Sequence, residues 1–217
     1  MNTYYLWSIG CQMNDADAAR LRHGLAQMGL TPTTNAHEAA LVVLITCVVR
    51  QKAEDKVIGR LSSLKNLKRS VPHAKVVVMG CFVHDEAALR SRFPFVDAFF
   101  RPSDTSGLLD YVRKRCPPQG DDATTQALDL AEAPRVSALI PISEGCDHHC
   151  TYCIVRLRRG RQRSRSLSDI VAEANEWARR GAREVTLLGQ NVDAYGQDFG
   201  PQVLNSLSEW NSPNKHT

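Results

Sequence analysis

The sequence has 217 residues, 43% of them hydrophobic, and a formal net charge of +4 at pH 7. That is enough apolar material for a real core in one large unit or two small ones, and no apolar run approaches the length of a membrane span. The seven cysteines are an odd number and no signal peptide precedes them, so we expect free thiols in a cytoplasmic protein rather than disulfides.

The first half alternates short apolar runs with amphipathic segments. Strands are predicted at 4–9, 41–46, 75–80 and 96–100. Helices are predicted from a cap at Asn14 or Asp15 to Gly29, and at 52–68, 85–92 and 105–115. Continuous apolar strands that alternate with helices are typical of an α/β fold with a doubly wound parallel sheet, and we assign residues 1–116 to this unit.

The second half is predicted to begin another α/β unit. Residues 117–135 contain prolines, a glycine and four acidic residues, which is typical of a linker; Cys116, just before it, is expected to be structural or incidental. A strand at 136–142, a helix from 169 to about 180 capped by Ser168, and a strand at 184–188 are predicted to follow. We assign residues 136–200 to this unit and residues 201–217 to a polar, divergent tail.

Three cysteines of the first unit occupy equivalent positions. Cys11 follows the first predicted strand, Cys47 the second and Cys81 the third. The carboxyl ends of parallel strands lie along one edge of a sheet, where open α/β sheets bind ligands. Each cysteine alone is more simply explained as a small buried hydrophobic residue. Three of them at three equivalent strand ends favour a shared metal site instead.

Three further cysteines lie in one short loop, Cys146, Cys150 and Cys153, with the spacing C-x3-C-x2-C. Three thiolates bound to a 4Fe–4S cube leave one iron open, and an open position on a metal can hold a substrate or cofactor. A zinc site completed by His148 or His149 is the alternative. Zinc motifs usually contain two C-x2-C pairs, whereas this loop contains one.

These two patterns carry a family resemblance. The loop resembles the signature of the radical S-adenosylmethionine (SAM) enzymes, in which the open iron chelates SAM and one electron cleaves it to a 5′-deoxyadenosyl radical. The strings Ser8-Ile9-Gly10-Cys11-Gln12-Met13-Asn14, Thr46-Cys47-Val48-Val49-Arg50 and Gly80-Cys81 are similar to the N-terminal domain of the methylthiotransferases, radical SAM enzymes with a second 4Fe–4S cluster.

The resemblance implies a fold and a set of cofactors. The second unit would be the start of a radical SAM partial (β/α) barrel, and the cofactors would be two 4Fe–4S clusters and SAM. Cys11, Cys47 and Cys81 would hold the cluster that handles sulfur, and the C-x3-C-x2-C loop the other. The chain departs from the family at Ile45, where Asn is usual, which concerns the local geometry of the loop.

Other residues acquire expected roles through the same resemblance. Gly189, Gln190 and Asn191 follow the second strand of the barrel and would help to hold the SAM amino group. Tyr152 would pack near the adenine of SAM, with ordinary core packing as the alternative.

Six arginines lie within ten residues with no acidic residue among them: Arg156, Arg158, Arg159, Arg161, Arg163 and Arg165. A solvated basic face is the usual fate of such a run. Contact with RNA phosphates is the functional alternative that we favour, because the run adjoins the proposed radical site. One or two of these arginines are alternatively ligands of the SAM carboxylate. Arg156 stands where the family commonly has Pro.

The strings Cys-Gln-Met-Asn and Leu-Leu-Gly-Gln-Asn-Val, with Tyr195-Gly196, resemble most the family members that act on tRNA. This implies an enzyme that adds a methylthio group to C2 of an isopentenylated adenosine beside the anticodon, with tRNA, an electron donor and a sulfur source as partners and no membrane. The alternative is the sibling that modifies a ribosomal protein.

The chain contains only about two barrel strands and no C-terminal RNA-binding β domain, so we expect a truncated family member. A catalytically incompetent iron–sulfur remnant and a zinc-binding RNA module are two competing hypotheses.

Overall fold

The computed structural model describes residues 2–115 and 136–200. Cys116, the expected linker at 117–135 and the expected tail at 201–217 lie outside the described residues, so these predictions are not addressed by the fold. Within the described ranges, none of the helices combines the length and the apolar character that crossing a bilayer requires.

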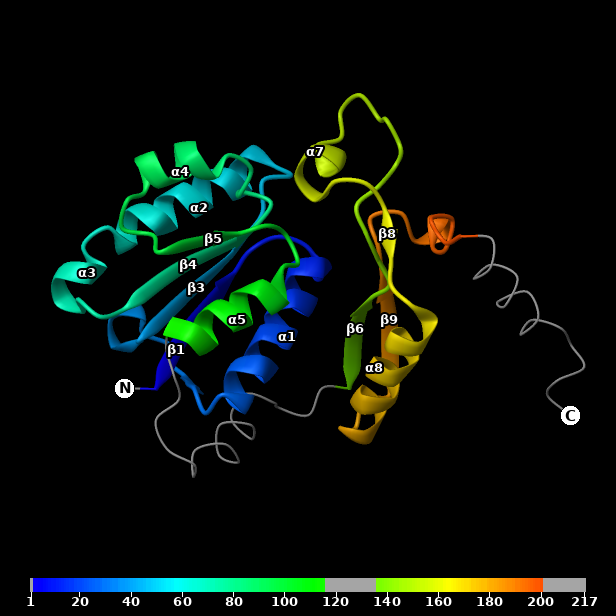
Figure 1. Cartoon of the computed structure of the whole chain (residues 1–217), viewed down its shortest axis with the longest axis horizontal. Helices are drawn as coiled ribbons and strands as arrows, with labels where there is room; N and C mark the ends of the chain where they lie inside the picture. Colours follow the sequence, from blue (N-terminus) through cyan, green and yellow to red (C-terminus); the bar gives the residue numbers. More distant parts are fainter. Residues whose placement is uncertain (1, 116–135, 201–217) are drawn as a thin grey trace, which may run out of the picture.

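The first unit contains a parallel sheet of five strands in the order β2-β1-β3-β4-β5 (Figure 1). Their bounds are β1 (Thr3–Ser8), β2 (Thr31–Pro32), β3 (Leu41–Thr46), β4 (Lys75–Gly80) and β5 (Ala98–Phe100). β3 lies at the centre of the sheet, and all six of its residues are buried. This explains why its sequence is a continuous apolar run instead of an alternating one.

Helices cover both faces of this sheet. One face packs against α1 (Gln12–Gln27) and α5 (Thr105–Arg115), and the other against α2 (Gln51–Leu64), α3 (Leu67–Ser70) and α4 (Glu86–Arg92) (Figure 1). Alternate residues of the central strands supply the two cores: Val43 and Ile45 pack with α1, whereas Val42 and Leu44 pack with α2. A short 3-10 helix, η1 (Ala36–Glu38), precedes β3. The prediction of an α/β fold with a doubly wound parallel sheet is confirmed.

The second unit is small. Its strands β6 (Ser137–Pro141) and β9 (Glu184–Leu188) form a parallel pair, and β7 (Ser143–Glu144) and β8 (Arg163–Ser164) an antiparallel pair. Helix α8 (Leu167–Arg179) packs Ile170 and Trp177 onto Ile140 of β6. The remaining elements are α7 (Val155–Arg159) and η2 (Val192–Ala194).

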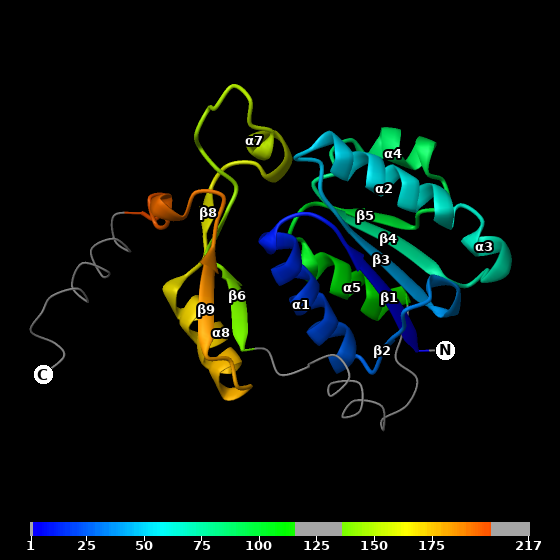
Figure 2. The same ribbon diagram turned by 180° about the vertical axis from the view of Figure 1, so that it is seen from behind.

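The two units meet along α1. Figures 1 and 2 show this helix between the five-stranded sheet and the β6–β9 pair. Met13 and Ala16 of α1 pack with Leu188 of β9. Further along the helix, Arg20 donates to Glu173 of α8 at 3.0 Å. α1 therefore serves as a wall for both units.

Several predicted boundaries differ from the structure. α1 begins at Gln12 with Cys11 as its N-cap residue, so Asn14 and Asp15 lie inside the helix and do not cap it. The cap of α8 is Ser166, whose hydroxyl accepts from the Asp169 amide at 3.1 Å, and not Ser168. The helix predicted at 52–68 is divided into α2 and α3, since the chain bends after Leu64.

Candidate functional site

The carboxyl edge of the five-stranded sheet has a topological switch point. β1 lies between β2 and β3, and the helices that follow β1 and β3 pass to opposite faces of the sheet, which opens a crevice between these two strand ends. Cys11 follows β1, Cys47 follows β3 and Cys81 follows β4. All three line a single pocket of about 280 Å³, which we call the three-cysteine pocket.

Two glycines allow the loops that carry these cysteines to touch. Gly10 has φ +142°, and a Cβ built there would lie 2.7 Å from Cβ of Cys47. Gly80 has φ +117°, and a Cβ there would collide with the carbonyl oxygen of Thr46. Both conformations favour glycine and neither position has room for a side chain, so the residue types before Cys11 and Cys81 follow from the close approach of the loops.

Two buried polar side chains tie the same loops together. Asn14 Nδ2 donates to the carbonyl oxygens of Ile9, at 2.7 Å, and of Thr46, at 3.2 Å. The Thr46 hydroxyl donates to the carbonyl of Met79 at 2.8 Å. These bonds join the residues that precede all three cysteines. Ile45, which stands where the family usually has Asn, is fully buried in the core on the α1 side.

The second unit contributes an arginine to this site. From the end of α7, Arg159 donates to Ser103 Oγ at 3.0 Å and to Asn14 Oδ1 at 3.2 Å. Its guanidinium also lies beside the Cys81 thiol. Burial raises the pKa of Cys81, and the positive charge of Arg159 opposes that rise. The two units therefore share one polar network beneath the three-cysteine pocket.

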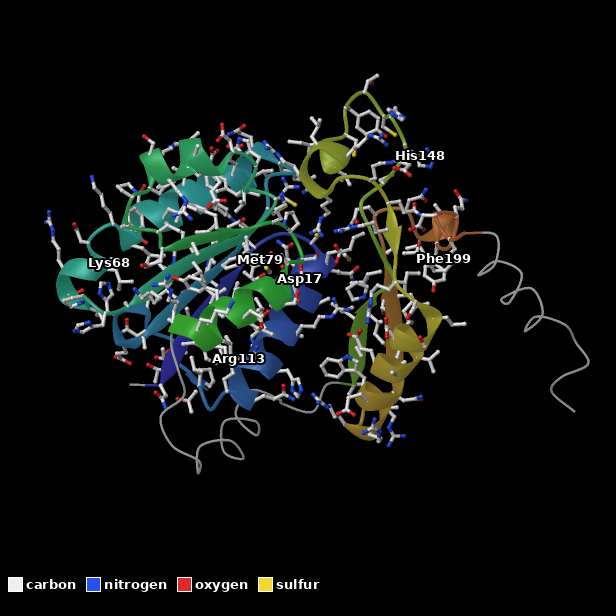
Figure 3. The ribbon with its side chains drawn as sticks, viewed as in Figure 1. Asp17, Lys68, Met79, Arg113, His148 and Phe199 are labelled. Carbon is white, nitrogen blue, oxygen red and sulfur yellow. The ribbon has the colours of Figure 1, made fainter. Side chains whose placement is uncertain are left out.

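Asp17 of α1 completes this network (Figure 3). It is 1% exposed and accepts a hydrogen bond from Ser103 Oγ at 3.0 Å, while its Oδ1 has no hydrogen-bond partner in the described part of the chain. Burial raises the pKa of Asp17 to about 6, against smaller opposing effects of Ser103 and Arg159. Asp17 and Ser103 are not among the candidate residues that the sequence indicates, whereas Arg159 is expected there as part of the arginine run and not as a partner of Asn14 and Ser103. The one available signal is a carboxylate set among small apolar residues in Ala16-Asp17-Ala18-Ala19.

The second group of cysteines lies on the loop between β7 and α7. Cys146 is partly buried, whereas Cys150 and Cys153 are exposed. The amide of Cys153 donates to the carbonyl of Cys150 at 3.1 Å, and the amide of Cys146 to that of Gly160 at 3.2 Å. Gln190, just after β9, accepts from the Gly145 amide at 2.6 Å. The loop is thus held at its base by the segment that follows β9.

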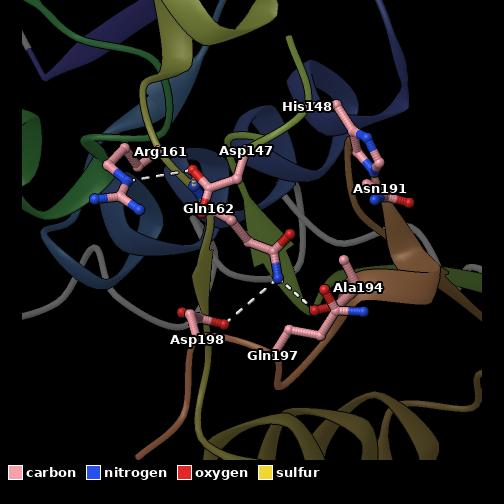
Figure 4. A pocket seen from close by; sticks show the side chains of 8 residues that line it. All are labelled: Asp147, His148, Arg161, Gln162, Asn191, Ala194, Gln197 and Asp198. Carbon is pink, nitrogen blue, oxygen red and sulfur yellow. Dashed lines mark hydrogen bonds and ion pairs between the residues drawn. The ribbon is translucent and has the colours of Figure 1, made fainter.

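Beside this loop lies a pocket of about 680 Å³, which we call the large polar pocket (Figure 4). Asp147 forms ion pairs there with Arg156, at 3.2 Å, and Arg161, at 3.3 Å. Gln162 donates to the Ala194 carbonyl and so joins the loop to η2. The pocket is polar and lined by both charges: Asp147, His148, Arg161, Gln162, Asn191, Ala194, Gln197 and Asp198.

The donor sets fit a multi-iron cluster better than a single ion. In the described residues, no three His, Cys, Asp or Glu side chains are grouped so that they could hold one metal ion, and this holds for both cysteine trios as well as for sets with His148 or His149. A cube distributes its ligands over different irons, which places them farther apart than ligands around one zinc. Both trios consist of thiols alone, the usual donors to iron–sulfur clusters, and the first lines a common pocket.

The residues expected to contact SAM lie in different places. Gly189 and Gln190 line the three-cysteine pocket, and Asn191 lines the large polar pocket. Tyr152 is 90% exposed, so its ring is not packed in a core. The segment that follows β9 therefore contacts both hollows.

Most of the six arginines are engaged within the protein. Arg156, Arg161 and Arg165 form ion pairs, the last with Glu173 at 2.7 Å, and Arg159 lies in the network described above. Arg158 lines the three-cysteine pocket, and its Nε is buried without a partner in the described ranges. Arg163 is exposed. The run is not a uniformly solvated face, and its contact with RNA stays a prediction.

Comparison with known proteins adds two domain matches. Residues 3–101 match the family described as "Uncharacterized protein family UPF0004", and residues 140–204 match the radical SAM superfamily. The second match covers the unit in which the sequence predicts a partial radical SAM barrel.

Curated relatives named tRNA-2-methylthio-N(6)-dimethylallyladenosine synthase match nearly the whole chain. The protein of Dehalococcoides mccartyi strain ATCC BAA-2266 is 48% identical over 200 residues, which are 92% of this chain and 45% of the relative. That of Herpetosiphon aurantiacus is 39% identical over 96% of this chain and 48% of its own. That of Clostridium tetani is 35% identical over 93% of this chain and 47% of the relative. The chain spans about half the length of these relatives.

The two domain matches and these relatives agree with the resemblance carried by the cysteine motifs. The chain thus combines a UPF0004 match with a radical SAM match, and it is similar over nearly its whole length to about half of each of these radical SAM methylthiotransferases.

Proposed function

We propose that this chain forms the cluster-binding part of an enzyme that adds a methylthio group to C2 of an isopentenylated adenosine in tRNA. The observation that carries the proposal is the three-cysteine pocket, because residues of both units line it: Cys11, Cys47 and Cys81 from the first, and Arg158, Arg159 and Gln190 from the second. The names of the relatives support the choice of a tRNA adenosine as substrate.

In this proposal the two cysteine trios hold two 4Fe–4S clusters. When bound, the cluster of Cys146, Cys150 and Cys153 supplies the electron that cleaves SAM, and the cluster of Cys11, Cys47 and Cys81 supplies sulfur. Gly10 and Gly80 let the loops that carry Cys11, Cys47 and Cys81 come close together. Asn14 holds these loops through its hydrogen bonds. Arg159 provides a positive charge beside the anionic thiolates.

Residues of the second unit would position SAM. Gln190 orients the base of the cysteine loop through the Gly145 amide, and the neighbouring Asn191 presents its amide to the large polar pocket. The exposed ring of Tyr152, adjacent to Cys153, is available to cover the adenine. An electron donor and a sulfur source are further partners that this chemistry needs.

The first test is anaerobic reconstitution of the 217-residue chain with iron and sulfide. We expect about eight irons per chain and a brown chromophore. Serine at Cys11, Cys47 and Cys81 should remove about four irons, and serine at Cys146, Cys150 and Cys153 the other four. Cys116→Ser is the matched control and should leave the iron content unchanged. Colourless protein that retains zinc would overturn the proposal.

The second test separates the roles of the two trios. With SAM and a strong reductant, release of 5′-deoxyadenosine should require the cysteines of the C-x3-C-x2-C loop. The Cys11→Ser, Cys47→Ser and Cys81→Ser variants should retain cleavage while losing sulfur transfer to an RNA that contains isopentenylated adenosine. Cleavage that is lost only in these last variants would reverse the assignment of the clusters.

A further inference from the structure

A second hollow adjoins the three-cysteine pocket on the side of α2. Its volume is about 490 Å³, and it is lined by Ile9, Gly10, Cys11, Cys47, Val49, Arg50, Lys52, Ala53 and Lys56. We infer that this hollow, which we call the α2 pocket, binds the phosphate backbone of the RNA substrate next to the modified nucleotide. The inference rests on the proposed function and assigns the contact to the first unit instead of the arginine run.

The charge of the α2 pocket is one-sided. Arg50, Lys52 and Lys56 are exposed, and none of them forms an ion pair with a residue of the described ranges. Lys52 and Lys56 are four residues apart on α2 and therefore point to the same side of the helix. No carboxylate of the described residues lines the pocket. Three cations around one hollow are the kind of surface that attracts a phosphodiester backbone.

The start of α2 adds to this positive potential. Arg50 is the N-cap residue, its side chain makes no capping hydrogen bond, and the amides of the first turn lie at this end of the helix. The two acidic residues of α2 are Glu54, in its first turn, and Asp55, which accepts from Gln51 at 3.0 Å, and neither is part of the lining. This end of the helix lies beside the three cations and the hollow.

The size and the walls favour RNA over a small anion. Sites for small organic ligands have volumes of roughly 300–1,000 Å³, and the α2 pocket falls in this range. Its walls include Ile9, Ala53 and Val49, the last with 56% of its surface exposed. Apolar walls between cations suit a nucleotide, whose ribose and base lie beside its phosphate. An isolated inorganic anion would use the cations and leave these walls in water.

The arginine run supplies fewer free charges. Four of its six members are held by intramolecular ion pairs or hydrogen bonds, and Arg158 faces the three-cysteine pocket. The cations of the α2 pocket have no ion pair in the part of the chain that the structure describes, and Cys11 and Cys47 form part of the same lining. An RNA strand bound there lies against the thiols that are proposed to handle the sulfur.

The test is the salt dependence of RNA binding by the 217-residue chain. The probe is a 17-nucleotide hairpin with an unmodified adenosine in its loop, and binding is followed by fluorescence anisotropy from 0.1 to 1 M salt. The double variant Lys52→Gln and Lys56→Gln should lower the slope of log K against log salt by about 1.4, because each lost contact with single-stranded RNA contributes about 0.7. At 0.1 M salt this corresponds to binding that is about 25-fold weaker.

The matched control removes the same charge elsewhere. Lys65 and Arg69 are exposed, lie at the far end of α2 and in α3, and have no ion pair within the described residues. Lys65→Gln with Arg69→Gln should leave the slope within about 0.3 of the parent. Thermal melts of both variants should match that of the parent, because all four side chains are on the surface.

Three outcomes overturn the inference. Equal slopes for the two double variants would show that only net charge matters. If the variant with Lys52→Gln and Lys56→Gln no longer binds inorganic phosphate but binds the RNA hairpin as the parent does, the pocket is a site for a small anion. A parent chain that does not bind the hairpin would exclude RNA from this face. None of these results depends on iron content or SAM cleavage, so the proposed function is judged separately.

Discussion

Asn14 shows how much of the candidate site depends on side chains that are not ligands. Its amide nitrogen donates hydrogen bonds to two loop carbonyls, and its amide oxygen accepts one from Arg159 of the second unit. The sequence suggests a helix cap at this position, because Asn is common at caps. The structure instead uses the donor and the acceptor of one amide to bring separate segments together, a role that only the fold reveals.

Asp17 provides a prediction at the scale of one residue. Its folded pKa of about 6 lies above the ordinary 3.8, so the folded state holds the proton more tightly than the unfolded state. The stabilising contribution of Asp17 is complete below about pH 4 and is lost as pH rises through 6. In Asp17→Asn, the free energy of unfolding relative to that of the parent should therefore increase by about 3 kcal/mol between pH 4 and pH 7.

Urea denaturation of both proteins at several pH values measures this difference. Ser103 can still donate to the amide oxygen of the new Asn, so the hydrogen bond at 3.0 Å is retained in the variant. A difference between the two proteins that does not change with pH would show that the buried carboxyl keeps an ordinary pKa.

The six cluster cysteines could be proposed from sequence for two separate reasons. Three of them share a local spacing, and the other three follow consecutive apolar strands. Neither reason extends to Arg159, Ser103 or Asp17, whose importance comes from contacts over 56 to 145 residues of sequence. Spacing along a chain contains no information about such contacts until the strands have been ordered.

Among the elements, short apolar strands are the easiest to predict. The bounds of the buried strands β3 and β4 agree with their apolar runs, as do those of β9, in which only Leu188 is buried. α5 agrees with its amphipathic segment. α7 escapes prediction, because its five residues include three arginines and none of them is buried. The β7–β8 pair has only two residues in each strand, which is too short to produce a pattern.

The N-terminus of α8 gives a prediction at the scale of an element. The Ser166 hydroxyl accepts from the Asp169 amide, so Ser166→Ala should lower the free energy of unfolding by about 1 kcal/mol. Ser168→Ala is the matched control. Its hydroxyl lies 3.0 Å from that of Ser166 and caps no amide of the helix, so the loss should be within about 0.5 kcal/mol. Equal losses in chemical denaturation would contradict the assignment of the cap.

At the scale of the whole molecule, the contact between the units is the feature that sequence could not supply. Glu173 of α8 lies between Arg20 of α1, at 3.0 Å, and Arg165, at 2.7 Å. Burial raises the pKa of Glu173, but its hydrogen bonds and the charges of Arg20 and Arg165 outweigh this and hold the pKa below its ordinary value. The carboxylate therefore stays charged near neutral pH and links the two units.

A double-mutant cycle tests this link. Arg20→Gln and Glu173→Gln, alone and together, should give a coupling energy of about 1 kcal/mol in urea denaturation at pH 7, because both side chains are only partly exposed. The same cycle with Arg90 and Glu86, an exposed pair within α4, should give less than about 0.5 kcal/mol. Equal values for both cycles would mean that the units do not depend on this contact.

Residues spaced by three along α1 each have a distinct structural role. Cys11 is the N-cap residue, Asn14 bonds the carbonyls of Ile9 and Thr46, and Asp17 accepts from Ser103. Arg20 and His23 contact α8 and its C-cap residue Arg180. Such a helix should tolerate a substitution better than an insertion, which rotates every later position about the helix axis. One amino acid inserted after Asp17 would turn the positions beyond it by about 100° and advance them by about 1.5 Å. Cys11 would keep its place while Arg20 and His23 swung away from α8, so the length of this helix sets the alignment of one domain with the other.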